Sequence, residues 1–308
     1  MAENRSQALR TFRSDAGMAK YMAAYDAVLR EWPVPYEELD LPTRFGTTHV
    51  IASGAHDAPG VLLLPSLAGS ATLWRPNVAA LSQCYRVYAV DMIGQVGKSV
   101  STRRLRTRRD LADWLSDVLD ALQLRSASFI GSSYGACAAL NQASLTPERV
   151  ERVVLIGPAG IFGPMSWSFY FAMLITGPIR KLLRPNRPRD ITELLGRHAR
   201  IAPSDARWRE LMSVTMSVSA IPNTVRVGVF SDAELAAIRA PTLLLIGEHE
   251  RLYDARAMLN RAMKRMPGLS GAIIPNAHHL AALAQPEDVN ARIMQFLSSR
   301  QPDIGAAE

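Results

Sequence analysis

The sequence predicts an α/β fold with a mostly parallel sheet, helices on both faces of the sheet and an inserted helical cap. Short apolar runs rich in Val, Ile and Leu alternate with helical patterns along most of the chain, which is the order of βαβ units. This alternation stops near residue 160 and resumes near residue 233. We therefore expect a core of residues 1–159 and 233–308 and a cap of residues 160–232.

The expected elements follow one another in a regular order. Residues 1–34 carry apolar side chains at helical spacing and predict an N-terminal helical extension. Residues 36–41 and 47–52 flank a turn at Gly46 and predict an antiparallel edge. Parallel strands are expected at residues 61–64, 87–90, 128–130, 153–156, 242–246 and 272–274. Helices are expected at residues 72–81, 111–122, 134–143, 254–266 and 286–297.

The composition argues against several kinds of partner. Of the 308 residues, 48% are hydrophobic, and the formal net charge is +7. The arginines gather at 103–109 and 180–189 without interleaved aromatic residues or a nucleic-acid-binding module, so we expect no nucleic-acid partner. The longest apolar run, 161–179, is interrupted by glycines and prolines, so we expect no membrane span.

The N-terminal residues and the cysteines bear on location. Residues 1–32 lack the continuous apolar stretch of a signal peptide. Cys84 and Cys137 have neither a disulfide nor a metal-binding spacing, which favours a reducing compartment. We therefore expect a cytoplasmic protein without a metal site. The sequence does not specify the oligomeric state and leaves a homodimer open.

The segment Gly131-Ser-Ser133-Tyr-Gly135 stands where the strand at residues 128–130 passes into a helix of small residues. A turn this sharp crowds the backbone, and the two glycines relieve the crowding while they leave the Ser133 hydroxyl exposed. A G-x-S-x-G pattern alone occurs by chance, but here a strand precedes it and a helix follows it. Ser133 is therefore predicted to be a catalytic nucleophile.

Two further strand ends carry the groups that activate a serine. The strand at residues 242–246 is followed by Gly247-Glu-His-Glu250, and the strand at 272–274 by Pro275-Asn-Ala-His-His279. Ligand sites lie at the carboxyl ends of parallel strands, so we expect these side chains to meet near Ser133. The order serine, acid, histidine along the chain is the order found in α/β-hydrolases.

With these motifs, nearly the whole chain resembles the α/β-hydrolase family, and in particular its bacterial carboxylesterase-like members with a helical cap. The family's histidine loop commonly reads Asn-Ala-Gly-His, then four residues, then Glu-x-Pro. Aligning Pro286 with that proline implies that His279 is the catalytic base. His278 and Ala284 then replace the family's glycine and glutamate.

For the acid, the resemblance implies the carboxylate three residues after the glycine that ends the strand. That residue is Glu250. Glu248 and Asp254 are the alternatives. Glu248 is expected to point away from the site, and Asp254 to cap the following helix.

The resemblance also implies an oxyanion hole of two backbone N–H groups. One belongs to Tyr134, directly after the nucleophile. The other belongs to Leu67, in the loop 65–70, which is similar to the family's His-Gly-x-x-x-Ser turn. Pro65 and Ser66 replace the usual His-Gly, so the Ser66 hydroxyl is a candidate for substrate contact.

The loop 91–99 is similar to the family's Asp-x-x-Gly-x-Gly-x-Ser loop, with its second glycine and its serine one place later than usual. Read alone, this loop could suggest a phosphate site. Its glycines are too close together for the Gly-x-x-x-x-Gly-Lys-Ser frame, so nucleotide binding is not expected. We expect a turn near the site instead.

The predicted cap contains aromatic and methionine side chains that could line an apolar pocket above Ser133. The candidates for substrate binding are Met165, Trp167, Phe171 and Met216. The same side chains are equally compatible with a hydrophobic core of the cap itself.

Together, the motifs and the resemblance predict a serine hydrolase of the carboxylesterase type. Its expected substrate is a small to medium apolar ester, cleaved through an acyl-enzyme intermediate without a metal or other cofactor. Hydrolysis of lactones or carbon–carbon bonds and perhydrolysis on the same three residues are alternatives. A non-catalytic ligand-binding protein is an alternative of another class, because a fold alone does not fix a function.

Overall fold

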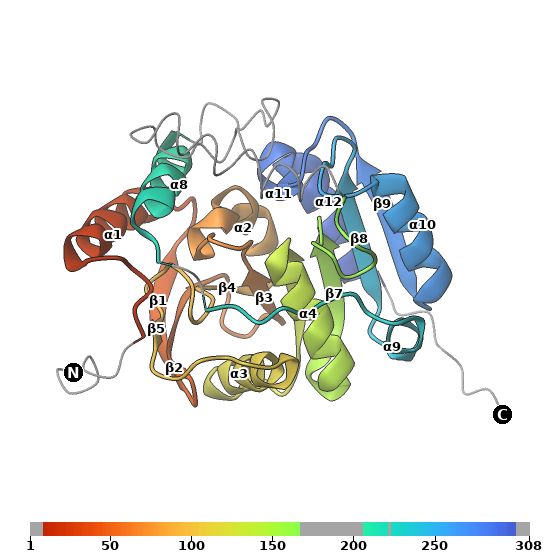
Figure 1. Ribbon diagram of the computed structural model, residues 1–308, viewed down its shortest axis with the longest axis horizontal. Coiled ribbons are helices and arrows are strands. Elements are labelled where there is room, and N and C mark those ends of the chain that lie inside the picture. The colour runs from red at the N-terminus through yellow and green to blue at the C-terminus, as the bar shows by residue number, and fades with distance from the viewer. Residues whose placement is uncertain (1–8, 167–205, 221–222, 300–308) are drawn as a thin grey trace.

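The computed structural model describes residues 9–166, 206–220 and 223–299 (Figure 1). A nine-stranded sheet runs through this described part in the order β1-β2-β4-β3-β6-β7-β8-β9, with β5 paired to β2. The strands are β1 Tyr36–Thr43, β2 Gly46–Ser53, β3 Gly60–Leu64, β4 Arg86–Val90, β5 Val100–Ser101, β6 Ala127–Ser132, β7 Val150–Ile156, β8 Thr242–Gly247 and β9 Leu269–Ile274.

The sheet has a parallel part and an antiparallel edge. Strands β4, β3, β6, β7, β8 and β9 run parallel to their neighbours in this series. β1, β2 and β5 form the antiparallel edge, which joins the rest through the pairing of β2 with β4. The carboxyl ends of all the parallel strands therefore lie along one edge of the sheet, where ligand sites form in such folds.

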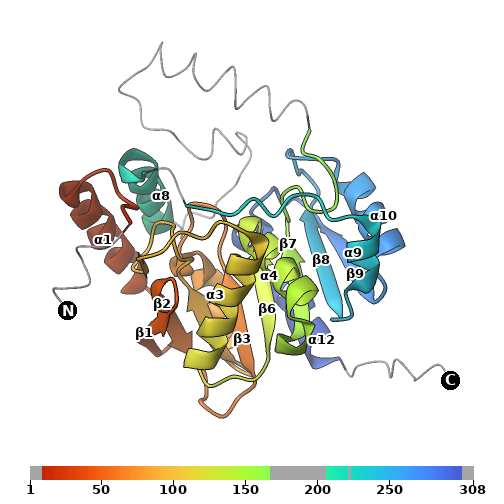
Figure 2. The same cartoon turned by 60° about the horizontal axis from the view of Figure 1, so that its bottom comes forward.

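Helices cover both faces of the sheet (Figures 1 and 2). One face buries the apolar side chains of α3 Arg108–Ala121, α4 Tyr134–Leu145, α9 Asp232–Ala237 and α10 Ala255–Arg265. The other buries those of α1 Asp15–Leu29, α2 Arg75–Leu81, α8 Ala206–Val218, α11 Ala281–Ala284 and α12 Pro286–Ser298. Alternate residues of β3 enter the two hydrophobic clusters, because the side chains of a strand point alternately to its two faces.

The N-terminal helix α1 lies beside α8 in both ribbon views. The backbone before α1 is tied to the end of α8, since the Arg13 N–H donates to the Val218 carbonyl over 2.9 Å and the Ala220 N–H donates to the Thr11 carbonyl over 2.9 Å. A Cβ atom on Gly17 would lie 3.1 Å from the Cβ of Val218. The two helices therefore approach as closely as a glycine allows.

The segment after α8 returns to the core at several points. The Tyr134 hydroxyl both donates to the Val225 carbonyl and accepts from the Val225 N–H, each over 3.1 Å. Further on, the Phe230 N–H donates to the Ile161 carbonyl over 2.9 Å, and both of these side chains are fully buried. Much of the predicted cap, including Trp167 and Phe171, lies outside the described residues.

The structure corrects the helix expected at residues 72–81. A 3-10 turn covers Ala71–Trp74, and the α-helix α2 begins only at Arg75. The reason is Pro76, which has no N–H group to donate to the carbonyl of Thr72. A proline is tolerated in the first turn of a helix, so α2 begins one residue before it.

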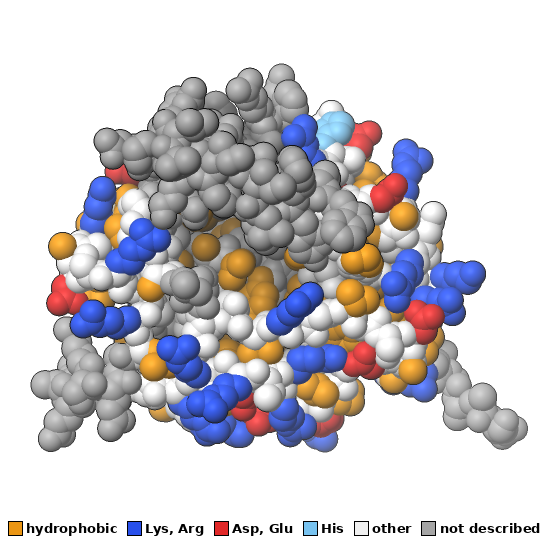
Figure 3. Space-filling view, in the orientation of Figure 1, with side chains coloured by type: hydrophobic (Ala, Val, Ile, Leu, Met, Phe, Trp, Pro, Cys, Tyr) orange, Lys and Arg blue, Asp and Glu red, His pale blue; other side chains and the backbone are white. Residues whose placement is uncertain are grey.

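Figure 3 shows the side chains on the face seen in Figure 1. Lys and Arg side chains gather along its lower edge (Figure 3). In the sequence, Arg103, Arg104 and Arg106 before α3 and Arg109 on α3 are exposed. A hollow between α2 and α4 displays hydrophobic side chains instead. Among the described residues, we find no helix with the length and the apolar character that a membrane crossing requires.

Candidate active site

Ser133 connects β6 to α4 through a strained turn. Its backbone has φ 52° and ψ −108°, an unusual conformation for a residue with a side chain. The Ser133 N–H is held by the Ile156 carbonyl of β7 over 2.8 Å. Such strain persists only where the surrounding structure enforces it, and it is typical of functional sites.

The two glycines of the motif allow this turn to pack. A Cβ atom on Gly131 would overlap the backbone of Gly135, and one on Gly135 would overlap the carbonyl of Leu64. Leu64 also pairs with Gly131 in the parallel register of β3 and β6. The turn that carries Ser133 therefore lies directly against the start of the loop 65–70.

The structure brings Ser133, His279 and Glu250 together in one chain of hydrogen bonds. His279 Nε2 lies 2.8 Å from Ser133 Oγ, and His279 Nδ1 lies 2.7 Å from Glu250 Oε2. The ionised carboxylate can only accept hydrogen bonds, so Nδ1 carries the ring proton and Nε2 is left to accept from the serine hydroxyl. The Glu250 side chain is completely buried and that of His279 is 8% exposed.

Glu250 is ionised in spite of its burial. Burial raises its pKa, but the hydrogen bond and charge of His279 and the N–H groups of Leu252 and Arg251 outweigh that effect and hold the pKa below the ordinary value. The two N–H groups donate to Glu250 Oε1 over 2.9 and 2.7 Å. Both carboxylate oxygens are thus engaged, which fixes the side chain against the imidazole ring.

The two alternative carboxylates occupy other positions. Glu248 Oε2 accepts from the Asn276 N–H over 3.0 Å and so bridges to the backbone of the histidine loop. Asp254 caps α10 by accepting from the Ala257 N–H over 2.9 Å. His278 is buried beside His279, and its Nδ1 lies 3.2 Å from the carbonyl of His249. Of the three carboxylates Glu248, Glu250 and Asp254, Glu250 is the one that is hydrogen-bonded to His279.

The two N–H groups predicted for the oxyanion hole come from adjoining segments. Tyr134 is the first residue of α4, and the first N–H groups of a helix have no partner within it. The described residues also provide no acceptor for the Leu67 N–H, whereas the neighbouring Ala68 N–H is bonded. Both groups are therefore free to donate to a ligand, as an oxyanion hole requires.

The described substrate-binding candidates lie in different surroundings. Ser66 is buried, and its hydroxyl faces Gly69 within the turn of the loop. Met165 is partly buried beside Gly160, shortly after β7. Met216 is partly buried on α8, the helix that packs on α1. No described contact joins these three side chains to Ser133.

Sequence reasoning missed two residues at this site. Gly157 follows β7 with φ 53°, and a Cβ atom there would lie 2.7 Å from the His279 carbonyl oxygen and 3.7 Å from Glu250 Oε2. Gln95 is buried and accepts a hydrogen bond from the Ala68 N–H over 3.1 Å. A glycine directly after a parallel strand could have drawn attention to Gly157. Gln95 lies in the loop 91–99, which the sequence predicted to be near the site, but nothing in that pattern distinguished Gln95 itself.

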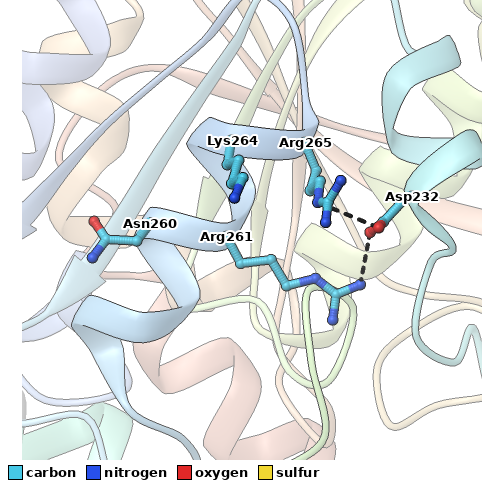
Figure 4. Close-up of a pocket in the computed structure, with 5 residues that line it drawn as sticks. All are labelled: Asp232, Asn260, Arg261, Lys264 and Arg265. Atoms are coloured by element: carbon cyan, nitrogen blue, oxygen red, sulfur yellow. Dashed lines mark hydrogen bonds and ion pairs between the residues drawn. The ribbon is translucent and has the colours of Figure 1, made fainter.

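A second group of polar side chains lies away from Ser133. A groove on α9 and α10 is lined by Asn260 and Lys264 together with Arg261 and Arg265, which both pair with Asp232 over 3.3 Å (Figure 4). We find no cluster of potential metal ligands within the described ranges. Burial raises the pKa of the Cys137 thiol to about 12, so this cysteine is not a nucleophile at neutral pH.

A parallel sheet with a serine at a strained strand-to-helix turn, followed along the chain by an acid and a histidine, defines the α/β-hydrolase class. The model of the Alpha/beta hydrolase family matches residues 61–292. The chain belongs to this family.

Relatives over nearly the full length come from Bacillus subtilis (strain 168). The chain is 38% identical to the carboxylesterase YbfK over 286 residues, which are 90% of this chain and 93% of the relative. It is 36% identical to the uncharacterized carboxylesterase nap over 292 residues, which are 93% and 94% of the two chains. The crystal structure of naproxen esterase (carboxylesterase NP) from Bacillus subtilis matches with a TM-score of 0.83 at 36% identity, over 92% of this chain and 99% of that one.

Proposed function

We propose that this protein is a carboxylesterase that cleaves small to medium apolar esters through an acyl-enzyme formed on Ser133. The observation that carries the proposal is the hydrogen-bond chain from Ser133 through His279 to the ionised Glu250. A serine hydroxyl is a weak nucleophile, and this chain supplies the base that activates it. The names of the relatives in Bacillus subtilis support the ester as the substrate.

The first half of the reaction forms the acyl-enzyme. Ser133 Oγ attacks the ester carbonyl carbon while its proton passes to His279 Nε2, and Glu250 stabilises the imidazolium that results. The negative charge of the tetrahedral intermediate falls on the former carbonyl oxygen, which the N–H groups of Leu67 and Tyr134 stabilise. When the intermediate collapses, the carbon–oxygen bond to the alcohol breaks and His279 gives its proton to the leaving oxygen.

The second half repeats these steps with water. His279 Nε2 takes a proton from a water molecule as the water oxygen attacks the acyl carbon. The second tetrahedral intermediate then releases Ser133 Oγ, which regains a proton from His279, and the carboxylic acid departs. Residues of the chain handle every proton and charge in this sequence.

Two observations support an apolar substrate and a reducing location. The hollow between α2 and α4 displays hydrophobic side chains (Figure 3), and burial of an apolar acyl or alcohol group there would contribute to binding. Cys84 and Cys137 are both free thiols, which fits the cytoplasmic location that the sequence predicts.

The test is hydrolysis of p-nitrophenyl esters from acetyl to dodecanoyl by the wild type, Ser133→Ala and Ser132→Ala. Ser132 is fully buried next to the nucleophile, so it provides the same chemical change without loss of the attacking hydroxyl. We expect Ser133→Ala to lower kcat by about 10³-fold or more with the fold retained, because the variant cannot form the acyl-enzyme. Ser132→Ala should keep activity close to that of the wild type.

The acyl series measures the size of the pocket as well as the activity. Ester turnover that disappears in Ser133→Ala and persists in Ser132→Ala would support the carboxylesterase. Failure of the wild type on every ester would contradict it, and so would turnover that survives in a folded Ser133→Ala variant. Labelling of the wild type by a fluorophosphonate reports separately whether Ser133 is an activated nucleophile.

A further inference from the structure

The loop that carries the Leu67 N–H is held by a side chain from a different part of the sheet. We propose that Gln95 is a positioning residue for the oxyanion hole, because its amide oxygen fixes the backbone of Ala68, directly after Leu67. The inference rests on the proposed function, in which Leu67 donates to the oxyanion. It adds a residue outside the triad on which the reaction depends.

The contact is specific and occurs at a strained point. The Ala68 N–H donates to Gln95 Oε1 over 3.1 Å, and Ala68 has φ 60°. Residues with a Cβ atom rarely adopt this left-handed conformation, and it persists only where the surroundings hold it. Release of the Ala68 N–H would therefore allow the peptide group between Leu67 and Ala68 to rotate. The preceding peptide group, which carries the Leu67 N–H, would shift with it through the backbone of Leu67.

The backbone of Leu67 has few other contacts among the described residues. Its side chain is 47% exposed, so packing does not fix its backbone. Within the loop, the Gly69 N–H donates over 2.9 Å to the Ser66 carbonyl, which shares a peptide group with the Leu67 N–H. This bond closes the turn but joins it to no residue outside the loop. Among the described residues, the bond from Ala68 to Gln95 is the hydrogen bond that joins the middle of this turn to another part of the protein.

Gln95 is a firm support for this purpose. Gln95 is 1% exposed, and its backbone N–H donates to the Met92 carbonyl over 3.1 Å. Asp91, in the same segment, accepts from the Ala71 N–H and the Lys98 N–H, each over 2.7 Å. The segment that follows β4 therefore makes two hydrogen bonds to the region of the loop 65–70. One is to Ala68 within the loop, and the other is to Ala71, the residue after the loop.

The second amide atom of Gln95 argues against a purely structural role. Gln95 Nε2 is buried and has no hydrogen-bond partner among the described residues. Burial of an unpaired donor lowers stability, so an apolar side chain of the same size would serve the core better. The acceptor for Ala68 is what distinguishes glutamine from such a side chain at this position.

Displacement of the Leu67 N–H affects the transition state more than the bound substrate. The oxyanion exists only during the reaction, so a misplaced donor lowers kcat and leaves KM nearly unchanged. The variant Gln95→Met keeps the size of the side chain and removes the acceptor. We expect it to lower kcat about 10-fold to 100-fold, since small displacements of catalytic groups have effects of this order.

A matched control is available in α4. Gln142 is also fully buried, and its Nε2 donates to Ser116 Oγ over 3.0 Å, remote from the loop. Gln142→Met makes the same chemical change in the core. It should keep kcat within about threefold of the wild type, because the side chain of Gln142 does not contact the loop that carries the Leu67 N–H. Thermal unfolding of both variants shows whether their stabilities are comparable.

Gln95→Glu gives a readout that a structural role would not produce. A protonated glutamic acid resembles glutamine and can accept from the Ala68 N–H, whereas the ionised form adds a negative charge beside the oxyanion. We expect the ratio of its kcat to that of the wild type to rise as the pH is lowered from about 8 to about 5, the direction in which a carboxylate protonates. A ratio independent of pH would count against the proposal.

Two measurements separate this inference from the proposed function. The rate of Ser133 labelling by a fluorophosphonate needs no ester substrate, and it should fall in Gln95→Met and not in Gln142→Met. Amide hydrogen exchange at residues 66–69 needs no reaction at all, and it should be faster in Gln95→Met. A wild type that is labelled but hydrolyses no ester would contradict the esterase alone. Unchanged exchange and labelling in Gln95→Met, or an equal loss in Gln142→Met, would overturn the role of Gln95.

Discussion

Gly157 is a residue where a single methyl group would disturb the site. It follows β7 with φ 53°, and a Cβ atom there would lie 2.7 Å from the His279 carbonyl oxygen. We expect Gly157→Ala to displace the histidine loop and to lower kcat by about 10²-fold, as a shift of about 1 Å at the reacting groups can do. Steady-state kinetics with a p-nitrophenyl ester and a thermal unfolding curve measure the two effects.

The control for this substitution is Gly228→Ala. Gly228 also has a positive φ, 80°, but a Cβ atom there would meet nothing within 4 Å. Both variants carry the cost of an unfavourable backbone conformation, and only Gly157→Ala adds crowding against His279. Equal kcat values in the two variants would show that crowding at Gly157 does not matter for the reaction.

At the scale of residues, the sequence indicated some members of the candidate site and not others. The general rule for parallel sheets pointed to the three strand ends that carry Ser133, Glu250 and His279. The choice of Glu250 over Glu248 and Asp254, and of His279 over His278, needed the resemblance to the family. Their catalytic roles stay predictions. Gln95 could not be found in this way, because its role depends on the distance between two loops and not on its own neighbours in the sequence.

Among the elements, the contact between α1 and α8 depends on a small side chain. Gly17 lies on α1, and its backbone approaches Val218 at the end of α8. We expect Gly17→Leu to push the two helices apart and to lower Tm by several degrees, because overpacking costs about 1–3 kcal/mol. Ala19→Leu adds a similar side chain at an exposed position of α1 and should leave Tm nearly unchanged.

The kinetic effect of Gly17→Leu also tests whether α8 belongs to a substrate-binding cap. If α8 helps to line the substrate pocket, KM for the longer p-nitrophenyl esters should rise in Gly17→Leu and not in Ala19→Leu. An unchanged KM together with a lowered Tm would show that α8 supports the fold without contacting the substrate.

The expected elements differ from the observed ones for identifiable reasons. Each expected parallel strand lies within an observed strand, because continuous apolar runs are typical of buried parallel strands. β5 has only two residues and no pattern of its own, so it could not be predicted. The helix expected at 72–81 is observed as a 3-10 turn up to Trp74 followed by α2, because Pro76 prevents one continuous α-helix.

The dependence of stability on pH is a property of the whole molecule to which Glu250 contributes. The hydrogen bond and charge of His279 and two backbone N–H groups outweigh the effect of burial and lower the pKa of Glu250 below its ordinary value of 4.5. A carboxylate with a depressed pKa stabilises the folded state above the unfolded-state pKa. This contribution is lost as the pH falls through the lower pKa of the folded state.

Glu250→Gln removes that contribution. The wild type should therefore have the higher Tm at pH 7, and the difference in Tm between the two proteins should shrink as the pH falls below about 4.5, the ordinary pKa. Glu248→Gln changes an exposed glutamate of the same loop and controls for the loss of one negative charge. A Tm difference that stays constant between pH 7 and pH 3 would contradict the interpretation.

For the whole molecule, the alternation of strands and helices predicted the class of fold but not the order of strands in the sheet. In the structure, β3 lies between β4 and β6, so the loop after β3 contacts both the segment after β4 and the turn after β6. That arrangement brings Gln95, Leu67 and Ser133 into one region. Since many strand orders are compatible with the same alternation, these contacts became visible only in three dimensions.

The hydrogen bond between Phe230 and Ile161 has a consequence for how such a protein can diversify. It joins two points that are far apart in the sequence, so the ends of the intervening segment adjoin, while α8 and Val225 within that segment contact the core as well. A segment with adjoining ends can be replaced by a longer or shorter one at a small entropic cost, because that cost grows only slowly with loop length. The sheet and its three strand ends would stay as they are. If the proposed function holds, exchange of this segment is a route to new ester preferences that leaves Ser133, Glu250 and His279 in place.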